Sequence, residues 1–130
     1  MTTTSEHKEI VHTTAVNLVA RRLIENGIST RIGTKNREDL VLDNGKTISV
    51  RGLTESGRVP LMVGTSTPSW DYVAVVTYID YTIKKVHIIP KEDVEKIGIN
   101  SPLKSDGTDN WYINEGDYRQ YRDNYGVIDG

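Results

Sequence analysis

The chain has 130 residues, of which 36% are hydrophobic and 26% are charged, and its formal net charge is −2. This size suits a single domain over residues 1–130, and the near-neutral charge excludes a general attraction to nucleic acid or anionic membranes, so such a partner would need a local basic patch. The absence of cysteine, of a secretory-type N-terminus and of any membrane-length apolar run excludes disulfide scaffolds and membrane spans and predicts a cytoplasmic protein.

The first part of the chain has apolar residues at the spacing of a helix. Residues 1–5 form a polar segment that we expect to fray, with Ser5 as a suitable N-cap. Apolar residues then recur three and four positions apart, which places them on one face of a helix. These residues are Val16, Val19, Ala20, Leu23 and Ile24, extended by Val11, Ala15 and Leu18. Gly27 is a typical helix stop, so we predict an amphipathic helix over residues 6–26.

The period then changes to that of strands. Residues 28–33 predict a short strand and residues 39–52 predict a hairpin. A loop is expected over residues 52–60, followed by a partly extended segment over 61–69. Residues 70–80 are the most apolar stretch, which indicates a central strand that is buried on both faces.

The C-terminal half alternates between short elements. Residues 84–90 predict a strand, and Pro90 begins a short helix that ends near Gly98. A loop over residues 101–110 separates that helix from a short strand at 111–114. The tail has tyrosines at helical spacing, namely Tyr118, Tyr121 and Tyr125. The whole order predicts an α+β fold: an N-terminal helix packed on a mixed, mainly antiparallel β-sheet, with short C-terminal helices.

The hairpin has two candidate registers around Asn44 and Gly45. A two-residue turn would place Leu40 opposite Ser49, which mixes apolar and polar side chains on each face. A three-residue loop that ends at Gly45 in the left-handed conformation would instead pair Leu40 with Ile48. We prefer the second register, because it leaves one aliphatic face for the helix to cover.

The second register groups polar side chains on the other face. That face would carry Asp39, Val41, Thr47, Ser49 and Arg51, with Asp39 directly opposite Ser49. The simplest interpretation of such a face is that it is solvated. The functional interpretation is that an acid, a hydroxyl and a guanidinium converge there.

These residues and the order of the elements resemble the core of the PD-(D/E)XK nuclease superfamily, the restriction-endonuclease-like fold. In that family a first helix precedes a hairpin that carries Asp on one strand and Glu-x-Lys on the next. Asp39 stands at the Asp position, and Ser49 and Arg51 stand at the Glu and Lys positions. The residue before Asp39 is Glu38 rather than proline. The resemblance spans roughly residues 9–128 and implies a restriction-endonuclease-like core.

The departures from the family motif determine the expected activity. In the family two carboxylates hold Mg²⁺, which prefers charged oxygen ligands in octahedral geometry. Ser49 is neutral, and Arg51 keeps the charge of the lysine but not its ability to lose a proton. Asp39 would be the remaining metal ligand. The resemblance therefore implies a degraded, inactive site in a domain that binds nucleic acid or a protein partner.

Two alternatives remain open. The first is an active Mg²⁺-dependent endonuclease that uses Asp39, Arg51 and a migrated acid, with Glu55 as the leading candidate. Other acids that would have to be considered are Glu9, Glu25, Glu38 and Asp71. The second alternative is a structural homodimer whose exposed tyrosines form the interface.

Other side chains give weaker signals. Basic residues gather around the hairpin and would contact phosphates if they shared a surface. They are Arg31, Lys35, Arg37, Arg51 and Arg58, with Lys84 and Lys85 further along the chain. The histidines His7, His12 and His87 are too scattered to predict a zinc site, and His87 is expected to be packed. Trp70 and Trp111 are expected to pack in the interior.

Overall fold

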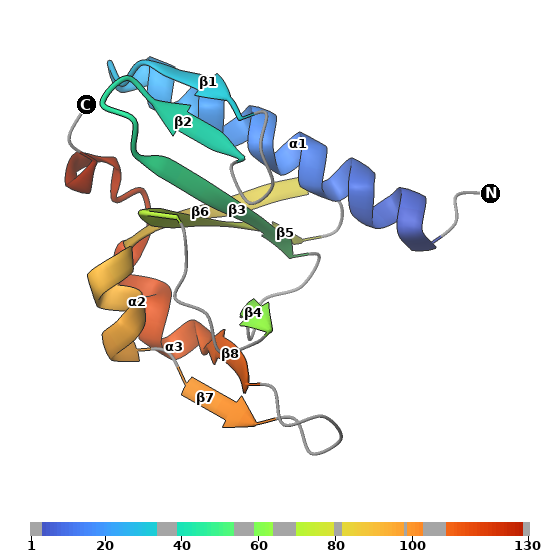
Figure 1. Ribbon diagram of the computed structural model, residues 1–130. Coiled ribbons are helices and arrows are strands. Elements are labelled where there is room, and N and C mark those ends of the chain that lie inside the picture. The colour runs from blue at the N-terminus through green and yellow to red at the C-terminus, as the bar shows by residue number, and fades with distance from the viewer. Residues whose placement is uncertain are drawn as a thin grey trace.

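The computed structural model describes residues 4–33, 39–53, 59–63, 70–79, 82–97, 99–102 and 109–128. Its centre is a five-stranded sheet (Figure 1). The long N-terminal helix α1 covers one face of that sheet, and the short helices and a small second sheet lie on the other side (Figure 1). The fold is therefore α+β, as the sequence predicts.

Helix α1 spans Thr4–Glu25. It begins earlier than expected, so residues 4 and 5 are helical rather than frayed. Gly27 ends the turn that follows the helix with a φ of +77°, a conformation that glycine adopts without strain. The predicted buried face is present, since Val19 and Leu23 are fully buried. Ile24 was assigned to that face wrongly: it is 61% exposed and points away from the sheet.

The five-stranded sheet has the order β1-β2-β3-β5-β6. These strands are β1 (Thr30–Ile32), β2 (Leu40–Leu42), β3 (Thr47–Leu53), β5 (Tyr72–Ile79) and β6 (Thr82–Pro90). Strands β3 and β5 run parallel, and every other neighbouring pair in this sheet is antiparallel. The mixed, mainly antiparallel sheet is thus confirmed. Strand β5 is buried on both faces, as its apolar sequence predicts.

The second layer consists of short elements. They are helix α2 (Lys91–Ile97), helix α3 (Glu115–Tyr118), the 3₁₀ turn Arg119–Tyr121, and strands β4 (Val59–Val63), β7 (Ile99–Pro102) and β8 (Asp109–Ile113). A further 3₁₀ turn, Tyr125–Val127, packs instead against the core on the α1 side of the large sheet. The strands form a three-stranded antiparallel sheet in the order β4-β8-β7. This second sheet was not expected from the sequence, and β4 begins inside a segment predicted to be a loop.

Two hydrophobic cores lie on opposite faces of the large sheet. Ile48, Val50 and Ile88 pack with α1 on the first face, whereas Ile89 and Trp70 belong to the second core, beneath α2 and α3. The predicted packing of Trp70 is confirmed at 3% exposure. The side chain of Trp111 lies outside the described part of the chain.

The tail tyrosines belong to these cores. Tyr118, Tyr121 and Tyr125 are all less than 10% exposed. The interpretation in which exposed tyrosines form a dimer interface is therefore wrong for these three residues.

Candidate functional site

The hairpin β2–β3 adopts the three-residue register. Leu40 pairs with Ile48, and the connecting loop ends at Gly45, whose φ is +87°. The Gly45 amide donates to the Leu42 carbonyl, and the Leu42 amide donates to the Lys46 carbonyl, both at 2.9 Å. The register predicted from the alternation of apolar and polar residues is thus confirmed. Its continuation brings residue 39 opposite residue 49.

Asp39 immediately precedes β2, and its carboxylate is held by two donors. The Val50 amide of β3 donates to Oδ2 at 2.6 Å, and the His12 Nε2 of α1 lies 3.0 Å from Oδ1. The Asp39 main-chain carbonyl accepts from the Gly33 amide at 3.0 Å. The Asp39 side chain is 20% exposed. Just before the first residue of β2, the Asp39 carboxylate therefore takes the place of a strand carbonyl as acceptor for a β3 amide, and it faces α1.

Ser49 and Arg51 lie on the opposite face of β3. Ile48 and Val50 pack beneath α1, and side chains alternate along a strand, so residues 49 and 51 face the second core. Ser49 is 3% exposed there. The structure therefore does not bring the carboxylate of Asp39 together with Ser49 and Arg51 on one face.

Arg51 instead shares its face with other polar residues. In the sheet register Arg51 lies beside Val75 of β5, and Val75 lies beside His87 of β6. His87 is 2% exposed and makes an edge-to-face contact with the Tyr118 ring at 4.9 Å between centroids. Thr77, also buried, has the same parity. The predicted packing of His87 is confirmed, and this face buries polar groups inside the molecule.

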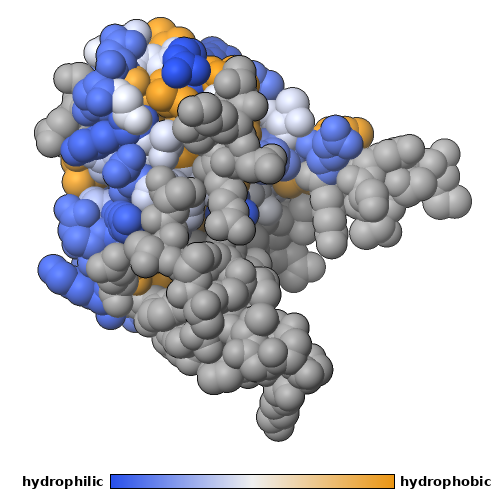
Figure 2. Space-filling view, viewed as in Figure 1, coloured by the Kyte–Doolittle hydropathy of each residue, from blue (hydrophilic) through white to orange (hydrophobic). Residues whose placement is uncertain are grey.

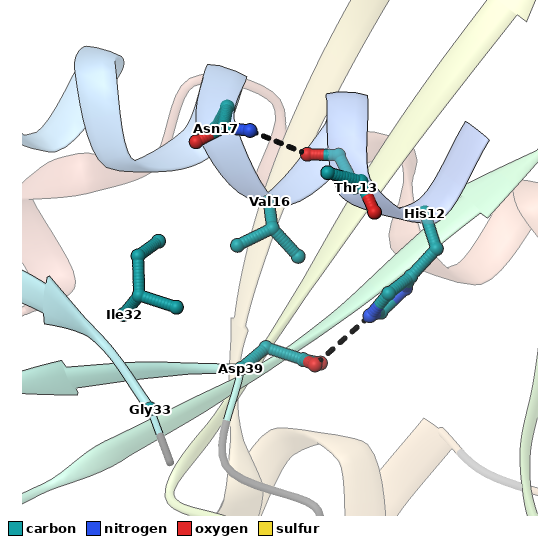
Figure 3. A pocket seen from close by; sticks show the side chains of 7 residues that line it. All are labelled: His12, Thr13, Val16, Asn17, Ile32, Gly33 and Asp39. Carbon is teal, nitrogen blue, oxygen red and sulfur yellow. Dashed lines mark hydrogen bonds and ion pairs between the residues drawn. The ribbon is translucent and has the colours of Figure 1, made fainter. Parts of the chain in front are cut away.

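A pocket of about 250 Å³ opens between α1 and the beginning of β2 (Figure 3). It is lined by His12, Thr13, Val16, Asn17, Ile32, Gly33 and Asp39. Figure 3 shows the His12 ring reaching down from the helix toward the Asp39 carboxylate, with Val16 and Ile32 forming an apolar side. Asn17 is turned back onto its own helix, where its amide donates to the Thr13 carbonyl at 3.0 Å.

His12 is the site residue that sequence reasoning missed. It lies seven residues before the buried Val19, which is two helical turns, so both project from the inner face of α1. Because His12 is near the end of the sheet, it extends over the sheet rim and remains 46% exposed. Extending the apolar stripe of the helix toward the N-terminus would have placed His12 on the sheet side.

Most of the remaining predicted site residues fall outside the part of the chain that the structure describes. Glu55, proposed as the migrated acid, lies outside the described residues, as do Lys35, Arg37 and Arg58. Arg31 is exposed on the edge strand β1. The structure therefore tests neither the basic patch nor the role of Glu55.

The other candidate acids have separate surroundings. The Asp71 Oδ2 accepts from the Thr47 amide at 2.9 Å, three residues before the Val50 amide that Asp39 binds. Glu25 pairs with Arg21 along the surface of α1 at 3.2 Å. No group of three metal-ligating side chains occurs among the residues that the structure describes.

Two tyrosines near α1 remain neutral at neutral pH. Burial raises the pKa of Tyr78, whose hydroxyl donates to the Val11 carbonyl at 3.2 Å. Burial is also the largest cause that raises the pKa of Tyr125 to about 12. Neither tyrosine lines the pocket, whose ionisable side chains among the described residues are His12 and Asp39.

Comparisons with known proteins do not show a family for this chain. No protein-family model matches the chain, and no curated protein matches it. Within the described residues, no helix is both long and apolar enough to cross a membrane.

Proposed function

We propose that this chain is a restriction-endonuclease-like domain with a degraded metal site, which acts by binding a nucleic acid or a protein partner. The arrangement of the elements supports the comparison. Helix α1 precedes a hairpin in which Leu40 pairs with Ile48, and one further step of that register would set position 39 opposite position 49, the two positions that the superfamily gives to its acids. Strand β5, the predicted central strand, pairs directly with β3.

One observation carries the argument for binding rather than hydrolysis. The two oxygens of Asp39 already accept from the Val50 amide and lie against His12, at 2.6 and 3.0 Å. Mg²⁺ requires several hard oxygen ligands in octahedral geometry. Ser49 supplies a neutral hydroxyl on the opposite face of β3. Because Ser49 is turned to the other face, a metal at Asp39 would therefore have little help from its neighbours.

Calorimetric titration with Mg²⁺ and Mn²⁺ tests the degraded site. We expect no saturable binding in the micromolar range by the full chain. The matched control is Asp71→Asn, because Asp71 also accepts a β3 amide but lies away from the pocket. Micromolar binding that survives in Asp71→Asn and disappears in Asp39→Asn would contradict the proposal.

A plasmid assay separates this proposal from an active endonuclease. We expect supercoiled plasmid to remain intact with either metal. Nicking that is lost in both Asp39→Asn and Glu55→Gln would establish the migrated-acid mechanism instead. Loss in Asp39→Asn alone would also contradict the proposal, since it would show that Asp39 supports cleavage.

A further inference from the structure

We propose that the pocket between α1 and β2 receives a basic side chain of a protein partner, with its ammonium or guanidinium group at Asp39. This inference rests on the proposed function, because it requires Asp39 to serve in binding rather than in metal chemistry. It also chooses between the two kinds of partner.

The charge of the pocket favours a cation. Asp39 is the one carboxylate among the described lining residues, and His12 carries charge only when protonated. A carboxylate offers about four acceptor positions on its two oxygens, and each Asp39 oxygen has one partner among the described residues. Lone pairs therefore remain for further donors. The Val50 amide fixes the carboxylate in place, so a ligand would not have to order it.

The shape of the pocket fits a hydrocarbon stem that ends in a charge. Its volume is about 250 Å³, and the buried Val16 and half-exposed Ile32 line its apolar side. Lysine and arginine carry three or four methylene groups behind the charge and bury them along apolar surface. Ile32 is 52% exposed, so its side chain can cover such a stem when a partner docks.

The same features disfavour a nucleic acid at this pocket. A phosphate would meet the Asp39 carboxylate, and like charges in a partly desolvated site repel each other. No Lys or Arg lines the pocket among the described residues. A basic protein side chain would instead form an ion pair with Asp39 beside or in place of His12, and the half-exposed imidazole can turn outward to admit it.

The test uses simple probes on the full chain. Butylguanidinium and butylammonium are titrated while NMR follows the Val50 and Gly33 amides and the His12 ring, with butanol and butyrate as the neutral and anionic controls. We expect saturable shifts with both cations, at most weak shifts with butanol and none with butyrate. Asp39→Asn should weaken cation binding by at least about tenfold, as loss of a charge-assisted contact predicts.

Two further variants distinguish a specific loss of binding from a general loss of folding. Ile32→Ser removes the apolar side at an exposed position and should weaken both cations severalfold while Asp39 remains. Asp71→Asn should leave their binding unchanged, because Asp71 does not line the pocket. Equal binding of butanol, or cation binding unchanged in Asp39→Asn and Ile32→Ser, would overturn the inference.

The last probe to be titrated is a short DNA duplex. It should not shift the three reporter groups, and saturable shifts of those groups by the duplex would overturn the choice of a protein partner. All titrations are run without divalent metal. The inference can thus fail while the metal and plasmid assays still support a binding domain, so the two failures are distinguishable.

Discussion

The two faces of the five-stranded sheet bury different chemistry. Among the described residues, the face under α1 buries hydrocarbon and tyrosine side chains, and the hydrogen-bonded pair of Asp39 and His12 lies at the rim. The other face buries four polar residues within its interior, namely Thr47, Ser49, Thr77 and His87. Polar groups at a rim keep access to ligands, whereas interior polar groups must be satisfied by the protein. Within the described ranges, the polar side chains of the large sheet that a ligand can reach at the Asp39–His12 rim are therefore on the α1 side.

The two sides of the sheet also differ in where large apolar side chains are exposed among the described residues. Figure 2 shows hydrophilic residues interspersed with small apolar areas over the described part of the visible surface. The three large apolar side chains that are exposed among the described residues are Ile10, Ile24 and Ile32. All three belong to α1 or to β1, which packs beside it. Apolar exposure and the charged pocket thus occur on the same side of the molecule.

The largest expected effect compares the two cores directly. Ile88 and Ile89 are adjacent on β6, both fully buried, and they point into opposite cores. We expect Ile88→Ala and Ile89→Ala each to lower the free energy of unfolding by about 2–5 kcal/mol. Urea denaturation measures both. A much smaller loss for Ile89→Ala would show that the polar face is packed less tightly than the α1 face.

The next effect concerns the close approach of α1 to the sheet. A Cβ added at Gly52 would lie 2.9 Å from the Val11 Cγ1 and 3.5 Å from the Ala15 Cβ. We expect Gly52→Ala to destabilise the fold by about 1–3 kcal/mol, because the helix must shift. Gly116→Ala is the control, since nothing lies within 4 Å of its added Cβ. Thermal unfolding of the two variants should differ clearly, and equal stability would place α1 further from β3.

A smaller effect compares two buried tyrosines. The Tyr121 hydroxyl, on the polar face, donates to the Asp93 Oδ2 at 3.0 Å. The Tyr125 hydroxyl, on the α1 face, has no hydrogen-bond partner within the described part of the chain. We expect Tyr121→Phe to lose about 1 kcal/mol and Tyr125→Phe to lose nothing or to gain stability. Denaturant midpoints measure the difference, and a larger loss for Tyr125→Phe would reveal a hidden partner.

The smallest effect is the alkaline dependence of Tyr125. Its folded pKa is about 12, above its ordinary value of 10.0. Below pH 10 the hydroxyl is protonated in both states, so its titration does not change stability. Between the two values the unfolded chain releases the proton and the folded chain keeps it, so stability falls as pH rises. Tyr125→Phe should make this decline less steep in unfolding measured from pH 9 to 11.5, and an unchanged slope would contradict it.

The local parts of this fold could be predicted from the sequence, and the long-range parts could not. The register of β2–β3 followed from Gly45 and from the alternation of Leu40 and Ile48 with polar neighbours. The pairing of β4 with β8 joins segments about fifty residues apart, and no local period indicates it. The predicted direction of the Asp39 side chain was wrong for a related reason. Asp39 precedes β2, so the alternation of side chains along a strand does not determine where its carboxylate points.

The segments of chain that connect β3 to its two neighbouring strands differ greatly in length. Four residues, 43–46, connect it to β2, whereas residues 54–71 separate it from the parallel β5. A nascent or truncated chain that ends before Tyr72 would thus hold the hairpin while leaving one margin of β3 with unpaired amides and carbonyls. Such a margin is a template for other strands. Expression fragments of this protein should therefore include β5 to avoid aggregation through that margin.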